Sequence, residues 1–133
     1  MRRVTITLLA SGLSAVLMFT WFQPNAGAIV PVPCYHPTTI CVAAFRFPGN
    51  HHLQLLITGP KDRYFRRYRL CVKAPDGSLA CDVFRVAQPK HRNFFSMVTW
   101  NRHFPDHGPG HYSARWRRLP DHRLVGKSGF PVG

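Results

Sequence analysis

Short stretches of the chain alternate apolar and polar residues, and prolines and glycines separate these stretches. In one of them Tyr68, Leu70 and Val72 occupy every second position, with arginine and cysteine between them. Successive side chains of a β-strand point to opposite faces, so this pattern predicts a strand with one buried face. Seven stretches are expected to form strands: residues 39–47, 53–58, 64–74, 78–86, 94–100, 111–117 and 123–132.

The spacing of these stretches predicts an all-β domain. Turn signals recur at intervals of roughly 8–12 residues, which is typical of a β-sandwich or a β-barrel. Convincing helical periodicity is confined to the apolar segment at the N-terminus. We therefore assign the fold to the all-β class.

One hairpin can be derived residue by residue. Residues 74–77, Ala-Pro-Asp-Gly, suit a type I turn, because proline fits its second position and glycine accepts the positive φ that follows. The resulting three-residue loop pairs Ala74 with Ser78. Counting outward from that pair places Cys71 opposite Cys81, where the short Cα separation of a non-hydrogen-bonded pair suits a disulfide. We therefore expect a Cys71–Cys81 disulfide.

The N-terminal residues have the pattern of a secretory signal peptide. Arg2 and Arg3 precede an apolar run over residues 4–22, and Ala26-Gly27-Ala28 supplies a small-residue cleavage site. An uncleaved membrane anchor is the alternative, since the run is long enough for a marginal span. We expect a signal helix that is cleaved near Ala28 and a secreted product, because a proline and the cleavage site both follow the run.

Cleavage would leave one exported domain. The chain would divide into a signal peptide at 1–28, a lead-in at 29–37 and a single β-sandwich domain at 38–133. No second apolar run reaches spanning length, so we expect no stable membrane insertion of the mature chain.

All four cysteines lie in the mature part, and an even count in an exported chain predicts two disulfides. Cys34–Cys41 is then the second pair by elimination, whereas a zinc site lacks the usual C-x-x-C spacing.

The C-terminal third contains a second local signature. Gly110-His111-Tyr112 leads into an alternating stretch, and residues 128–132 read as a closing edge strand. A glycine two residues before a strand-opening tyrosine resembles the tyrosine corner of immunoglobulin-like sandwiches. With the seven stretches, this resembles immunoglobulin-like or fibronectin type III-like domains of small secreted bacterial proteins. The resemblance implies a seven-stranded sandwich and no particular reaction.

The mature domain would be strongly basic. The formal net charge is +13, and loss of Arg2 and Arg3 would leave +11; the chain has five aspartates and no glutamate. Such a surface attracts anions over several ångströms at low salt. Candidate partners are acidic glycans, wall polymers, nucleic acid and anionic lipid surfaces, although the charge could also serve solubility alone.

The alternation predicts where part of this charge lies. The resemblance implies that the third and sixth strands are neighbours, with their apolar residues inside and their cations on one outer sheet face. The residues expected on that face are Arg67, Arg69, Lys73, Arg85, Arg115 and Arg117. The planar guanidinium group suits phosphate and carboxylate, so we interpret the face as a candidate anion-binding surface. A solvated face without a partner is the alternative.

Histidines offer a weaker candidate site. His103, His107 and His111 are spaced by four, but the prolines and glycines among them forbid a regular helix that would align them. A loop could gather two of them around zinc or copper, although solvated histidines are the simpler interpretation. We expect no cofactor.

Enzymatic motifs are absent from the sequence. It contains no G-x-S-x-G, no H-E-x-x-H and no phosphate-binding loop. We therefore expect a non-catalytic binding domain. A cationic membrane- or wall-active protein is the alternative, and a small nuclease using His103, His107 and Arg102 is a lesser one.

Overall fold

The computed structural model describes residues 39–47, 49 and 51–133. The expected signal peptide, the lead-in and Cys34 lie outside these residues. In the described part the elements are β1 (Cys41–Phe45), β2 (Gln54–Pro60), a 3-10 turn η1 (Lys61–Arg63), β3 (Arg67–Lys73), β4 (Leu79–Arg85), β5 (Asn93–Thr99), a single helical turn α1 (Trp100–His103), β6 (Gly110–Leu119) and β7 (Leu124–Val132). The all-β class and the seven strands are confirmed.

The strands begin and end within about three residues of the predicted bounds, and one of these differences changes the type of element. Trp100 was expected to end a strand, but it begins α1. Its backbone N–H donates to the carbonyl of Leu53, and Phe104 N–H donates back to Trp100 O, each over 2.9 Å. Pro105 follows at once and disfavours the helical conformation for Phe104, so the helix ends after one turn.

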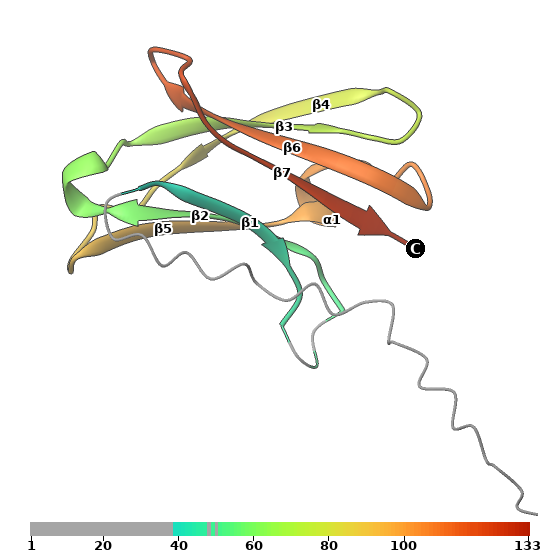
Figure 1. Cartoon of the computed structure of the whole chain (residues 1–133), viewed down its shortest axis with the longest axis horizontal. Helices are drawn as coiled ribbons and strands as arrows, with labels where there is room; N and C mark the ends of the chain where they lie inside the picture. Colours follow the sequence, from blue (N-terminus) through green and yellow to red (C-terminus); the bar gives the residue numbers. More distant parts are fainter. Residues whose placement is uncertain (1–38, 48, 50) are drawn as a thin grey trace, which may run out of the picture.

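The strands form two antiparallel sheets that face each other (Figure 1). One sheet has the order β1-β2-β5, and the other has the order β4-β3-β6-β7. Three connections cross between the sheets: η1 after β2, residues 86–92 after β4, and α1 after β5. The architecture is therefore β-sandwich-like, with β3 and β6 paired in the middle of the four-stranded sheet.

Aromatic and branched side chains fill the space between the sheets. Tyr68 and Trp116 are fully buried, and so are Leu55 and Ile57 from the opposite sheet. Each such side chain contributes about 1.5–3 kcal/mol through burial. The Tyr68 hydroxyl crosses the core to Ser96 Oγ, 3.0 Å away on β5, so its polar end keeps a partner. Burial raises the pKa of this phenol.

The derived hairpin register is confirmed. Cys71 lies opposite Cys81, and the two are joined by a disulfide. Ala74 N–H donates to Ser78 O over 2.9 Å, and Gly77 has a φ of 88°. The turn residues and the cysteine spacing therefore specify the same β3–β4 hairpin. Cys41 is also disulfide-bonded, but the expected Cys34–Cys41 pair stays a prediction because Cys34 is not described.

Tyr112 ties the start of β6 to the segment that precedes it. Its hydroxyl donates to Gly108 O over 2.8 Å and accepts from His107 N–H over 2.9 Å. The hydroxyl is thus bonded to two backbone groups of the segment that precedes β6. Gly110 is required nearby, because a Cβ there would lie 2.5 Å from Pro75 in the β3–β4 turn. The segment before β6 therefore packs against that turn.

No helix in the described part of the chain combines the length and the apolar character needed to cross a membrane.

Replacing Tyr112 with Phe tests this anchor. The ring would stay in the core, but the backbone groups of Gly108 and His107 would lose their partner. We expect a loss of about 1–2 kcal/mol, which lowers the melting temperature by roughly 4–8 °C per kcal/mol in a domain of this size. Tyr64→Phe is the control, because Tyr64 is only half-buried and its hydroxyl makes one bond, to Val86 O. Equal melting temperatures for the wild type and Tyr112→Phe would contradict the assignment.

Candidate anion-binding face

The six cations singled out in the sequence lie on the outer surface of the four-stranded sheet. Tyr68, Leu70 and Val72 of β3 are buried, so alternation turns the arginines and lysine between them outward. Across the sheet, Arg85 of β4 and two arginines of β6 occupy outward positions in register with β3. We call this surface the basic face and define it by Arg67, Arg69, Lys73, Arg85, Arg115, Arg117 and Lys127.

Lys127 is the member that the sequence prediction missed. It lies on β7 directly opposite Arg115. The alternation of residues 123–132 indicates a strand, but the pairing between β6 and β7 shifts between Trp116 and Arg117. Lys127 lies in the regular part of this pairing, and alternation with the buried Phe130 turns it outward. Its place opposite Arg115 follows only from the pairing of β6 with β7, which the local sequence does not specify.

Like charges stand directly opposite each other at three places on the basic face. The cross-strand partners are Arg67 with Arg85, Arg69 with Arg117, and Arg115 with Lys127. Directly opposed residues have Cβ atoms about 4.5–5.5 Å apart, and like charges in such pairs are destabilising. The face therefore has a cost in stability that a solvated mixture of charges would avoid.

The carboxylates lie away from this face. Four of the five aspartates lie in turns or connections, and Asp82 of β4 lies opposite the buried Leu70, which places it on the other side of the sheet. Among the described residues, Arg118 is the one arginine that forms an ion pair, with Asp121 in the β6–β7 hairpin. No cation of the basic face is therefore neutralised by an ion pair within the described part of the chain.

A shallow basin lies within the basic face. Its volume is about 420 Å³, and Lys73, Ser113, Arg115 and Arg117 line it beside Cys71 of the disulfide. Arg117 also donates to the carbonyl of His122 over 3.1 Å, which restrains its side chain. The disulfide joins β3 to β4 beside the basin, and restraint of the Arg117 side chain lowers the entropic cost of binding there.

Phenylalanine, tyrosine and tryptophan are absent from the outward positions of these four strands. Tyr68, Phe84, Tyr112, Trp116 and Phe130 belong to the core or pack against it, and the exposed His111 of β6 is the one ring at an outward position. The outward positions carry instead the cations and a few aliphatic residues, of which Leu79, Val83 and Leu124 are the exposed ones. The basic face itself therefore offers charge and hydrogen-bond donors but no Phe, Tyr or Trp ring on which a base could stack.

A second polar cluster lies at the β3–β4 turn. His107 Nδ1 is 2.9 Å from Asp76 Oδ2, and its Nε2 is 3.3 Å from Ser78 Oγ. These are the residue types of a Ser-His-Asp triad, but Ser78 Oγ donates to Asp76 Oδ1 over 2.6 Å. In a triad the hydroxyl proton goes to the imidazole. The contacts of His107 with Asp76 and Ser78 therefore connect the β3–β4 turn to the segment before β6.

Sequence reasoning did not find this cluster. Asp76 and Ser78 belong to one turn motif, but His107 lies 29 residues beyond Ser78, and no local pattern connects them. Hydrogen bonds from the Ser78 hydroxyl and backbone, followed by the charge of His107, hold the pKa of Asp76 below its usual range. The carboxylate form of Asp76 is therefore the form that the fold favours.

The three candidate metal ligands lie in different settings. His103 pairs with Asp82 over 3.6 Å, and His107 pairs with Asp76. His111 lies on β6 against Gly129. Within residues 39–47, 49 and 51–133, no three His, Cys, Asp or Glu residues form a group that could hold a metal ion.

Comparisons of this chain with protein-family models, with curated proteins and with solved structures found no match. The case for a function therefore depends on the geometry of the basic face and the cavities beside it.

Acid titration tests the Asp76 cluster. Because the pKa of Asp76 is lower in the folded chain, its stabilisation is present above the unfolded pKa of about 4 and disappears as the pH falls through the folded value. We expect Asp76→Asn to lower the melting temperature at pH 5–7 and to converge with the wild type towards pH 2. Circular dichroism melts across this range provide the measurement.

Asp121→Asn is the matched control for this titration. Its pKa is also lowered, by the hydrogen bonds and charge of Arg118, but it lies in the β6–β7 hairpin rather than the β3–β4 turn. The Asp76→Asn, Asp121→Asn double variant should show additive losses, since the two sites share no partner. A deficit for Asp76→Asn that stays constant from pH 2 to pH 7 would contradict the assigned role of this carboxylate.

Proposed function

We propose that this chain is a secreted, non-catalytic binding domain that holds an anionic polymer on its basic face. The observation that carries the proposal is the set of three opposed cation pairs on one sheet surface, with the aspartates elsewhere. Two unit charges 4 Å apart interact by about 1 kcal/mol in bulk water. An anion placed between the members of each pair replaces this repulsion by attraction.

The spacing of the cations suits a polymer better than a single small anion. Neighbouring strands lie about 4.8 Å apart, and outward residues repeat about every 6.7 Å along a strand. Arg67 to Lys73 thus spans about 20 Å of β3. A chain with closely spaced negative groups can engage several of these cations together, and release of its counterions then favours binding at low salt.

We also propose that the sandwich is of the immunoglobulin-like or fibronectin type III-like kind. Two observations support this: the third and sixth strands are paired at the centre of one sheet, and Tyr112 at the start of the sixth bonds to Gly108 O four residues upstream. Both are features of these sandwiches. The disulfide between Cys71 and Cys81 supports an oxidising, extracellular environment.

An anionic membrane surface is the second candidate partner. Leu79, Val83 and Leu124 are exposed among the cations of the basic face, and apolar groups beside cations favour adsorption to anionic lipid headgroups. This candidate predicts binding to vesicles containing phosphatidylserine and leakage of their contents. The polymer proposal predicts saturable binding to a soluble polyanion without vesicles.

Charge removal at the centre of the basic face tests the proposal. We expect the Arg69→Gln, Arg115→Gln, Arg117→Gln variant to bind heparin at least about tenfold more weakly at 0.1 M salt. The slope of log K against log salt should fall by about three, one for each lost contact. Isothermal titration at several salt concentrations measures both quantities.

The control variant is Lys90→Gln, Arg92→Gln, Arg102→Gln. These exposed cations lie between β4 and β5 and on α1, outside the basic face, and their removal changes the net charge equally. Equal weakening by the two variants would mean that net charge, and not this face, determines binding. That result would overturn the proposal.

A further inference from the structure

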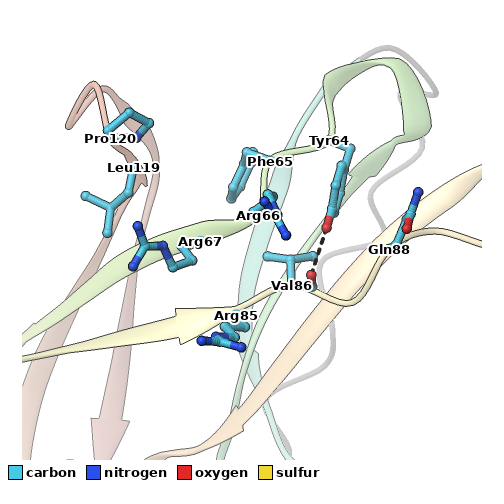
Figure 2. A pocket seen from close by; sticks show the side chains of 9 residues that line it. All are labelled: Tyr64, Phe65, Arg66, Arg67, Arg85, Val86, Gln88, Leu119 and Pro120. Atoms are coloured by element: carbon cyan, nitrogen blue, oxygen red, sulfur yellow. Dashed lines mark hydrogen bonds between the residues drawn. The ribbon is translucent and has the colours of Figure 1, made fainter.

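A cavity of about 650 Å³ opens at one end of the four-stranded sheet (Figure 2). It lies where β3 begins, β4 ends and β6 enters its hairpin with β7, opposite to the end fastened by the Asp76 cluster. We call it the end pocket; its lining residues include Phe65, Arg66, Arg67, Arg85, Val86 and Leu119. Arg67 and Arg85 belong also to the basic face, so the two surfaces are continuous.

Three arginines line the end pocket. Its lining contains no aspartate, and Arg66, Arg67 and Arg85 form no ion pair within the described part of the chain. In Figure 2 Arg67 lies between Leu119 and Arg85, and Arg66 lies beside Phe65. The pocket therefore combines three charged, bidentate donors with a hydrophobic wall, a combination suited to a ring that carries several negative groups.

The backbone of the pocket is held by hydrogen bonds. Val86 N–H donates to Arg66 O over 2.9 Å, and the Tyr64 hydroxyl donates to Val86 O over 3.0 Å. Figure 2 shows the second of these bonds below Tyr64. The wall that carries Arg66 is thus joined to the end of β4, and the pocket is formed before a ligand arrives.

The end pocket is larger than the basin of about 420 Å³ on the basic face. A volume of about 650 Å³ lies within the range of about 300–1,000 Å³ that is typical of small-molecule sites. The space is therefore sufficient for a whole sugar-sized unit and not only for a single phosphate or sulfate ion. Arg67 and Arg85, which belong to both surfaces, would then lie between this unit and the units that follow it on the basic face.

We infer that the end pocket is the subsite for the terminal unit of an acidic glycan whose following units lie on the basic face. This inference rests on the proposed function. The glycan is favoured over a single-stranded nucleic acid because successive bases of such a strand would stack on large aromatic rings, and the basic face presents no Phe, Tyr or Trp. The negative groups of the end unit contact Arg66, Arg67 and Arg85, and its ring lies against Phe65 and Leu119.

Arg66 and Arg115 allow the pocket and the face to be tested separately. Arg66 lines only the end pocket, whereas Arg115 lies only on the basic face. Both are exposed, so either change to glutamine should leave the fold intact. Thermal melts of both variants confirm this before binding is measured.

The probe is a sulfated heparin disaccharide, titrated into the purified protein by calorimetry. We expect one site per chain, about tenfold weaker binding for Arg66→Gln and less than a twofold change for Arg115→Gln. In nuclear magnetic resonance spectra, the methyl groups of Val86 and Leu119 should shift on addition of the disaccharide. Long heparin should remain bound by Arg66→Gln with a modest loss.

Other results would overturn the inference in distinguishable ways. If the wild type binds long heparin but not the disaccharide, the end pocket is not a subsite. The same conclusion follows if Arg115→Gln lowers the affinity for the disaccharide as much as Arg66→Gln does. If a 5′-phosphorylated oligonucleotide binds more tightly than long heparin, and Arg66→Gln weakens it, the partner is a nucleic acid. If neither heparin form binds, the proposed function itself fails.

Discussion

Burial of every second side chain in β3 and β6 is the constraint on which the rest of this structure depends. Tyr68, Leu70 and Trp116 are fully buried between the sheets. Because a strand points successive side chains to opposite faces, this burial leaves Arg67 and Arg69 with only the outer face. Any slip of one residue would expose the aromatic core and bury the guanidinium groups, so packing and surface charge are specified together.

The two ends of the four-stranded sheet differ in a way that matters for binding. At one end Tyr112, Asp76 and His107 join the β3–β4 turn to the segment before β6 through hydrogen bonds. At the other end the sheet opens into the end pocket, where arginines line the cavity without aspartate partners. The hydrogen bonds at the first end stabilise the β3–β4 hairpin, whose strand β3 carries Lys73 of the basin. The end pocket at the other end has space for a ligand.

Cations outnumber carboxylates in this domain, and the two kinds of charge also lie on different parts of its surface. Four of the five aspartates lie in turns and connections, and of these Asp76 pairs with His107 and Asp121 with Arg118. The cations of the basic face instead oppose one another across strands. Such an arrangement is destabilising, and it concentrates positive potential on one surface of the sheet. This contrast makes the outer sheet surface a better candidate site than the net charge alone would.

Much of the fold could be predicted from local sequence, because turns and alternation act over a few residues. The Ala74–Gly77 turn chemistry and the cysteine spacing determined the β3–β4 register, and alternation determined which residues of β3 and β6 are buried. The pairing of β3 with β6 followed only from a resemblance, and its register comes from the structure. Opposed pairs such as Arg69 with Arg117 depend on contacts between segments far apart in the chain.

Other features were decided by tertiary structure alone. Lys127 joins the basic face through the pairing of β7 with β6, and His107 contacts Ser78 in a turn 29 residues away from it in sequence. Arg66 becomes part of a cavity because three strand ends meet there. Local sequence determined the faces and the charge; the packing of distant strands decided which charges became neighbours, because alternation specifies only the direction of a side chain and not what lies beside it.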